Sequence, residues 1–173
     1  INQIDSLLNT LVTEKKSAGL TAGIRVNGGV PHFKEFGVSD IAAIQPVNAN
    51  SLFRIASVTK TITAVAIMSL TEKGKLKLTD KLSKFFKDFP KGDSITIYQL
   101  LSHTSGIPNW WEGEMPKDEP KDFPMCKNPH LYLQRMKTTS FFSPGTKHYY
   151  SNSGFVLLGE IIELVSGLSY EDY

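Results

Sequence analysis

Residues 53–70 read FRIASVTKTITAVAIMSL, and they place Ser57 and Lys60 three positions apart at the start of a strongly apolar segment. From Ser57 to Lys73 apolar residues cover most of a helical circumference, and Gly74 is a natural stop. We therefore expect a central helix over residues 57–73. A lysine at the mouth of such a helix either finds a partner or loses its proton, unless it is simply a solvated lysine of the first turn.

The spacing of Ser57 and Lys60 suits a serine nucleophile with a lysine beside it to accept its proton. A serine in the first helical turn has an unpaired backbone N–H and the positive end of the helix dipole beside it, so an oxyanion formed there is stabilised. Lys60, one turn on, lies on the same face, and a neutral amine there can accept the hydroxyl proton as Ser57 attacks a carbonyl. The pair predicts an acyl-transfer nucleophile, although so short a pattern also arises by chance.

A second short motif, Tyr150-Ser151-Asn152, stands about ninety positions later. A tyrosine near an ammonium has its pKa lowered toward the range of a general base, and an asparagine offers both a donor and an acceptor. The alternative is that Tyr149 and Tyr150 only pack, with Asn152 as the N-cap of a helix beginning near Phe155.

The remaining segments suggest an α+β chain. An amphipathic stripe predicts an opening helix that ends by Gly19, and residues 20–40 read as a β-hairpin around Asn27-Gly28-Gly29. Residues 95–101 fit a short helix or a strand, and residues 108–129 form a long loop rich in Pro, Lys and Asp. A helix over 155–166 ends at Gly167, and Ser169 with Asp172 begins another.

Composition narrows the function classes. With 173 residues, 40% hydrophobic and 21% charged, the chain is one globular domain or a large piece of one. A net charge of +2 is too mild to argue for nucleic acid. No window holds the roughly 18 apolar residues of a membrane span. One cysteine and four scattered histidines give no metal-ligand spacing.

Five other residues were weighed as candidates. We expect His103 to be a structural histidine satisfied within its turn, and His148 to lie on the surface or at the wall of a cleft. Trp110 and Trp111 either line a cleft or pack under the long loop. Cys126, within that loop, is interpreted as incidental.

Three segments, taken together in their order and spacing, carry a family resemblance: LFRIASVTKTITAVAIMSLTEKGKLKLTDKLSKFF, ITIYQLLSHTSGIPNW and FFSPGTKHYYSNSGFVLLGEIIELVSGLSYEDY. From about Ala22 to Tyr173 the chain closely resembles the serine β-lactamase and penicillin-binding protein superfamily, in its branch of class C β-lactamases, D-alanyl-D-alanine carboxypeptidases and related esterases. The resemblance implies that the nucleophile is Ser57 with Lys60, and that the second motif is Tyr150 with Asn152. No Ser-Asp-Asn tripeptide occurs, which favours the tyrosine branch.

The resemblance implies a β-lactamase/transpeptidase-like α+β fold, in which an antiparallel sheet with flanking helices adjoins a mostly helical region. Residues 1–173 would be the N-terminal part of one catalytic domain, with the first helix and strands over 1–56 and the nucleophile helix and helical region over 57–173. The family's third element, Lys-Thr-Gly or a His-x-Gly variant on a core strand, is missing. We expect a further segment or a second chain to supply the missing strands.

The activity implied is that of a serine hydrolase acting through an acyl-enzyme on a peptide, β-lactam or ester carbonyl. The substrate would be a small molecule or a peptidoglycan-derived fragment, and no cofactor is needed. The alternative is a catalytically silent protein that binds peptidoglycan or β-lactams on the same fold. The first residues lack a signal-peptide layout, so the chain is cytoplasmic or already processed, whereas the resemblance implies a periplasmic or secreted protein.

Overall fold

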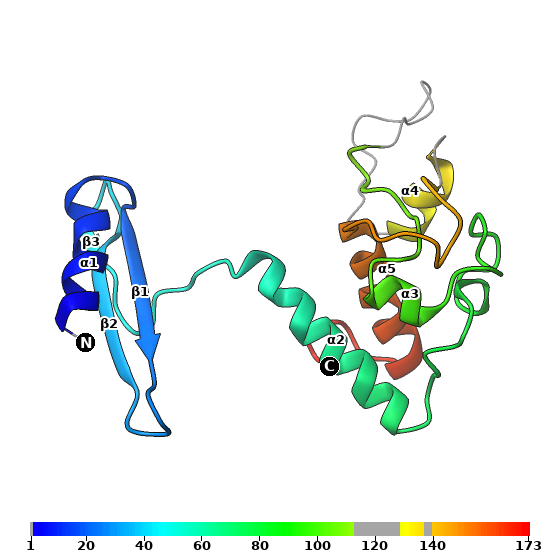
Figure 1. Ribbon diagram of the computed structural model, residues 1–173, viewed down its shortest axis with the longest axis horizontal. Helices are drawn as coiled ribbons and strands as arrows, with labels where there is room; N and C mark the ends of the chain where they lie inside the picture. The colour runs from blue at the N-terminus through cyan, green and yellow to red at the C-terminus, as the bar shows by residue number, and fades with distance from the viewer. Residues whose placement is uncertain (1, 113–128, 137–139) are drawn as a thin grey trace. The chain divides into compact units, whose positions relative to one another are not determined.

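The computed structural model describes residues 2–112, 129–136 and 140–173, and it divides the chain into an N-terminal unit, Ile1–Arg54, and a C-terminal unit, Ile55–Tyr173 (Figure 1). The division rests on geometry alone. The expectation that both units belong to one catalytic domain stays a prediction. Cys126 and most of the long loop expected over 108–129 lie outside the described residues.

The N-terminal unit is a helix packed on a small sheet. It contains α1 (Asn2–Thr13), β1 (Gly19–Ile24), β2 (His32–Asp40) and β3 (Gln45–Pro46), and its strands pair antiparallel in the order β1-β2-β3. The predicted hairpin is confirmed: β1 and β2 pair from Gly19 opposite Gly37 to Ile24 opposite His32. Asn27 and Gly28 take the positive φ angles, 49° and 72°, that the tight turn requires.

The first helix is shorter than its apolar stripe suggests. It ends at Thr13 rather than near Gly19, and the chain turns through Lys15 at a φ of 57°. A hydrogen bond joins α1 to the sheet, because Asp5 Oδ1 lies 3.0 Å from His32 Nε2 on β2. That contact is long-range, so the sequence pattern alone could not place it.

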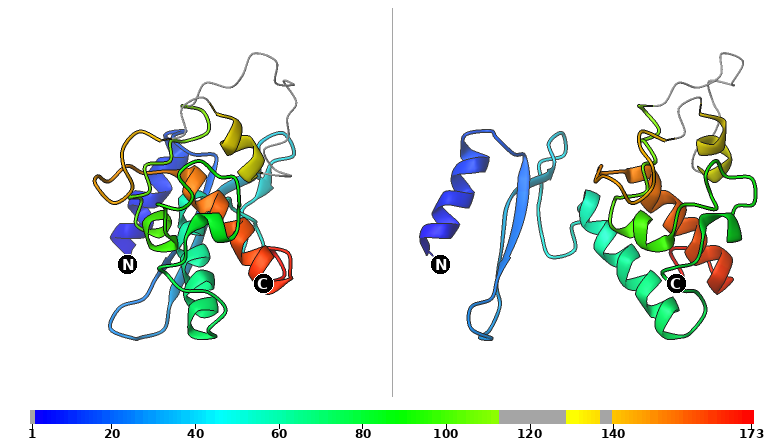
Figure 2. Two further views of the ribbon diagram at one scale, coloured as in Figure 1. Left: turned by 90° about the vertical axis from the view of Figure 1, so that its right-hand side faces the viewer. Right: turned by 45° about the vertical axis from the view of Figure 1, so that its right-hand side comes forward.

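The C-terminal unit is helical. It contains η1 (Ala56–Val58), α2 (Thr59–Glu72), η2 (Leu82–Lys84), α3 (Ile97–Leu101), α4 (Pro129–Arg135) and α5 (Asn152–Ser166). Three of these helices, α2, α3 and α4, pack against α5, and Figure 2 shows α5 beside α2. The fully buried face of α5 explains its central position, and it consists of Leu157, Leu158, Ile161 and Ile162.

Local signals set the ends of the helices. Residues 97–101 are a helix, one of the two expectations, and Thr96 begins it with a capping box made with Gln99. Gly167 ends α5 in the left-handed conformation at a φ of 75°, as expected. The structure corrects the start of α5: the helix begins at Asn152 rather than near Phe155. The capping side chain is therefore that of Ser151, which accepts from Gly154 N–H, and not that of Asn152.

The helix over residues 57–73 is present as η1 followed by α2, but it is buried on one face only. Thr63, Ile67 and Leu70 are buried. Other apolar side chains of α2 are exposed, with Val65 at 64% and Ile62 at 57%. Within the described ranges no helix is both long enough and apolar enough to cross a membrane.

Candidate active site

Ser57 occupies the turn that leads into α2. The first hydrogen bond of this turn runs from Val58 N–H to Ile55 O, at 3.1 Å, so the N–H of Ser57 precedes it and has no partner within the helix. Ala56, just before the serine, has a φ of 46°, a conformation that costs a non-glycine residue free energy and often accompanies function. The Ser57 side chain is exposed, so a carbonyl compound can reach it.

Lys60 does not behave as a solvated lysine. Its Nζ lies 2.6 Å from Asn152 Oδ1 and 3.3 Å from Ser57 Oγ. The same nitrogen lies over two aromatic rings, 4.8 Å from the centroid of Tyr150 and 5.5 Å from that of Phe155. Of the two outcomes for a lysine at this point, the structure shows the partnered one.

Tyr150 completes the contact around the serine. Its hydroxyl donates to Ser57 Oγ at 2.8 Å. Hydrogen bonding with Lys60, and then with Ser57, lowers the pKa of Tyr150 below its ordinary 10.0, against a smaller opposing effect of desolvation. A phenol of this kind can exchange a proton with Ser57 more readily than an ordinary tyrosine can.

Asn152, the first residue of α5, is hydrogen-bonded to Asn109, a residue that the sequence interpretation missed. The side-chain oxygen of Asn109 accepts from the backbone N–H of Asn152 at 2.7 Å and from its Nδ2 at 3.2 Å. Asn109 also donates to the carbonyl of Tyr150 at 3.2 Å and to Glu112 Oε2 at 3.1 Å. The signal lay inside the segment SHTSGIPNW, but nothing local to it shows a contact 43 positions away.

His103 has its side-chain hydrogen-bond partner outside its own turn, whereas the sequence predicted a partner within that turn. It adopts a φ of 59°, and its Nδ1 accepts from Ser151 N–H at 3.2 Å, which assigns the proton of the neutral ring to Nε2. Its ring lies 4.5 Å from that of Tyr150 and 5.1 Å from that of Phe155. Burial, and then the charges of His148 and Lys60, lower the pKa of His103 below 6.5.

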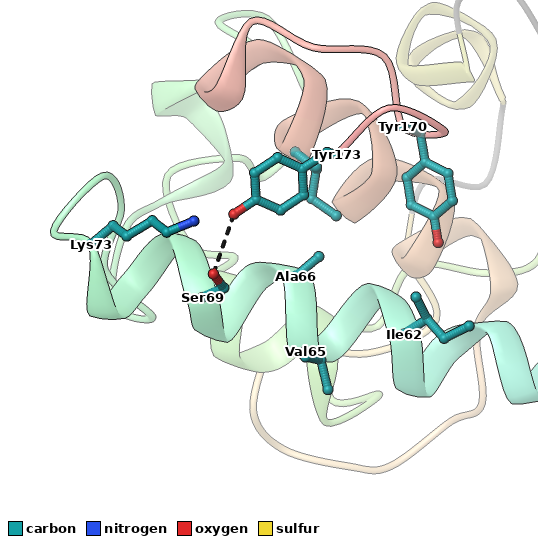
Figure 3. Close-up of a pocket in the computed structure, with 8 residues that line it drawn as sticks. Ile62, Val65, Ala66, Ser69, Lys73, Tyr170 and Tyr173 are labelled. Atoms are coloured by element: carbon teal, nitrogen blue, oxygen red, sulfur yellow. Dashed lines mark hydrogen bonds between the residues drawn. The ribbon is translucent and has the colours of Figure 1, made fainter.

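The three remaining candidates of the C-terminal unit, Trp110, Trp111 and His148, differ in where they lie relative to its pockets. Trp110 helps line a pocket of about 330 Å³ beside Lys60 and Asn152, whereas Trp111 packs edge-on against Trp110 and is 57% exposed. His148 is exposed. A second hollow runs along α2 between apolar side chains and Tyr173, whose hydroxyl donates to Ser69 Oγ at 3.4 Å (Figure 3). It holds none of the four predicted site residues.

Within the described ranges, no group of three His, Cys, Asp or Glu side chains is placed to hold a metal ion. The four residues predicted from the sequence, Ser57, Lys60, Tyr150 and Asn152, do meet at one point through the hydrogen bonds described above.

Known proteins resemble this chain along nearly its whole length. Penicillin-binding protein 4* of Bacillus subtilis (strain 168) is 33% identical over 170 residues, which are 98% of this chain and 37% of that protein. The solved structure of an octameric penicillin-binding protein homologue from Pyrococcus abyssi matches with a TM-score of 0.84 and 34% identity, covering 99% of this chain and 40% of that one. A class C β-lactamase in complex with cefoxitin matches with a TM-score of 0.80 and 27% identity, covering 99% and 46%.

These likenesses confirm the β-lactamase/transpeptidase-like α+β fold and the resemblance to penicillin-binding proteins and class C β-lactamases. The chain spans less than half the length of each of these three proteins, from 37% to 46%. The family model described as Beta-lactamase matches residues 4–173. Since that match leaves out only the first three residues, the chain belongs to the β-lactamase family.

Proposed function

We propose that the protein is a serine hydrolase that acts through an acyl-enzyme formed on Ser57. The observation that carries the proposal is the double contact of Ser57 Oγ, 2.8 Å from the Tyr150 hydroxyl and 3.3 Å from Lys60 Nζ. Ordinary hydroxyl groups are poor nucleophiles at neutral pH and need a positioned base beside them. A serine held between a tyrosine of lowered pKa and a lysine meets that need.

The proposed reaction has two stages, acylation and deacylation of Ser57. Ser57 Oγ attacks the substrate carbonyl carbon while its proton passes to the Tyr150 phenolate, and Lys60 stabilises that phenolate. The oxyanion forms near the unpaired N–H of Ser57, at the positive end of α2. The intermediate collapses, and the leaving group takes the proton from Tyr150. Water then attacks the carbonyl carbon of the Ser57 ester and gives a proton to the Tyr150 phenolate. Tyr150 returns this proton to Ser57 Oγ as the carbonyl–Oγ bond breaks and the acid leaves.

Asn152 is proposed to orient both Lys60 and the substrate. Its Oδ1 accepts from Lys60 Nζ, which holds the ammonium beside Ser57 and Tyr150. The pocket of about 330 Å³ beside Lys60 and Asn152 is largely apolar, with Trp110 and Phe155 among its lining residues. Such a pocket suits the side chain of an acyl group better than a charged group.

The substrate class is proposed from the family: a D-alanyl peptide derived from peptidoglycan, a β-lactam or an ester. The family's third element would supply a second oxyanion donor and a contact for the substrate carboxylate. We propose that a further segment or a second chain supplies it. A periplasmic or secreted location stays a prediction.

Turnover tests the proposal against the alternative of a silent binding protein. The full-length protein should hydrolyse a chromogenic cephalosporin or an activated ester, and Ser57→Ala should abolish that hydrolysis. Stoichiometric binding of the same compounds by the wild-type protein, with no turnover and no covalent adduct, would favour the silent binder.

A further inference from the structure

Asn109 is a buried polar residue that bonds to two residues of the candidate site, Asn152 and Tyr150. It is 4% exposed and comes from the turn that follows α3. Its side chain makes four hydrogen bonds, to the backbone and the side chain of Asn152, to the carbonyl of Tyr150 and to Glu112. An asparagine side chain has two N–H donors and an oxygen that can accept two hydrogen bonds, so these four bonds use all of its capacity.

The bonds form a chain of fixed polarity. Glu112 Oε2 accepts from Asn109 Nδ2, Asn109 Oδ1 accepts from Asn152 Nδ2, and Asn152 Oδ1 accepts from Lys60 Nζ. One end of the chain is a carboxylate, which when ionised only accepts, and the other end is an ammonium, which only donates. Hydrogen bonding from Tyr149, and then from Asn109, lowers the pKa of Glu112, which keeps it ionised near neutral pH.

This polarity decides which end of the Asn152 amide faces Lys60. An amide turned by 180° would present its NH₂ group to the ammonium and lose the bond of 2.6 Å. Asn109 Oδ1 prevents that turn, because it can only accept and therefore selects Nδ2 of Asn152. The backbone N–H of Asn152, which donates to the same oxygen, keeps Asn109 from turning in its place.

We propose that Asn109 is a positioning residue for the reaction at Ser57: it fixes the Asn152 amide with its oxygen toward Lys60, and Glu112 fixes Asn109. This inference rests on the proposed function. Asn109 touches no reacting atom in this scheme and acts only through Asn152 and the backbone at Tyr150. A misplacement of about 1 Å in such a group can cost about 10²-fold in rate.

A double-mutant cycle in the full-length protein separates positioning from a general structural role. The readout is the second-order rate of acylation by a penicillin, followed by mass. Asn109→Ala should slow acylation by about 10²-fold in the wild-type background. In the Asn152→Ala background the same change should cost less than about threefold, because the group being positioned is already gone.

Thr96→Ala is the matched control. The Thr96 hydroxyl accepts from Gln99 N–H at 3.2 Å and caps α3, so its loss should lower the melting temperature and leave the acylation rate unchanged. Equal losses for Asn109→Ala in both backgrounds would overturn the positioning proposal while leaving the proposed function intact. Absence of acylation in the wild-type protein would instead overturn the proposed function, and this inference with it.

A second pair of variants tests the proposal where Asn109→Ala does not fold. Asn109→Asp keeps an oxygen for Asn152 but puts a second carboxylate beside Glu112, so acylation should fall. Adding Glu112→Gln restores a donor opposite position 109. The double variant should therefore be acylated at least tenfold faster than the Asn109→Asp single variant. No recovery in the double variant, with both variants folded, would contradict the chain of fixed polarity.

Discussion

Lys60 Nζ lies 2.6 Å from Asn152 Oδ1, although 92 positions separate the two residues along the chain. Lys60 is the second residue of α2 and Asn152 the first of α5, so the N-termini of two helices meet at this contact. Both termini carry partial positive charge from their backbone dipoles. A phenolate on Tyr150 or an oxyanion at Ser57 therefore forms in surroundings that favour negative charge.

The first prediction concerns proton transfer. Lys60→Ala and Tyr150→Phe should each slow acylation of the full-length protein by about 10²–10⁴-fold. Tyr150→Phe removes the proton carrier, and Lys60→Ala removes the group that stabilises its phenolate. The double variant should be little slower than either single one, since the two residues act as a unit. Stopped-flow kinetics with a chromogenic β-lactam measures this.

Lys73→Ala is the control for these two variants. Lys73 caps the other end of α2 and lies over the ring of Tyr173, so its removal should leave acylation unchanged. If the loss of acylation rate in the double variant equals the product of the two single losses, Lys60 and Tyr150 act independently.

The second prediction concerns pH. Tyr150 acts as a base only when it is deprotonated. Because its pKa is lowered, the acid limb of the pH profile of kcat/KM should lie at a lower pH than it would with an ordinary tyrosine. The largest cause of the lowering is the hydrogen bond from Lys60. In Lys60→Ala the residual activity should therefore need a higher pH, with its limb moving toward about 10. A limb at the same pH in both proteins would exclude Tyr150 as the base.

The third prediction concerns His103 and stability. Its folded pKa lies below 6.5, so the unfolded chain binds the proton more tightly than the native state does. Its contribution to stability is present above about pH 6.5 and is lost as the pH falls below that value. His103→Asn, which tolerates the φ of 59°, should weaken this dependence. Urea denaturation at pH 5 and pH 8 checks it, and identical pH dependence in both proteins would refute it.

The fourth prediction compares two glycines. A Cβ at Gly106, whose φ is +81°, would lie 2.5 Å from Phe142 O and 3.0 Å from Ser140 Oγ. A Cβ at Gly74, whose φ is +67°, would meet nothing within 4 Å. Gly74→Ala should cost about 1–2 kcal/mol from backbone conformation alone, and Gly106→Ala about 2–4 kcal/mol because steric overlap adds to it. Comparable losses of unfolding free energy in the two variants would contradict this account.

Much of the arrangement around Ser57 could be predicted from the sequence, because its signals are local. Three-residue spacing puts Ser57 and Lys60 on one helical face, and Asn27 with Gly28 specifies a hairpin turn. The partnership with Tyr150 and Asn152 was available only through the family resemblance, since no helical period links residues about 90 positions apart.

What could not be predicted depends on long-range contacts or on a choice between equivalent residues. Ser151 and Asn152 cap helices about equally well, so the sequence could not decide that α5 begins with Ser151 as its cap. Asn109 resembles an ordinary turn residue until the structure brings its oxygen to 2.7 Å from Asn152 N. The apolar circumference of α2 indicated burial on most sides, whereas the structure buries one face of the helix, at Thr63, Ile67 and Leu70.

The central claim is that Ser57 is the acylated residue. The most direct measurement is peptide mapping by mass spectrometry after the full-length protein has been incubated with a penicillin or an activated phosphonate. The account predicts one adduct, on the peptide that contains Ser57, and its loss in Ser57→Ala. An adduct on another residue that survives Ser57→Ala would contradict the account.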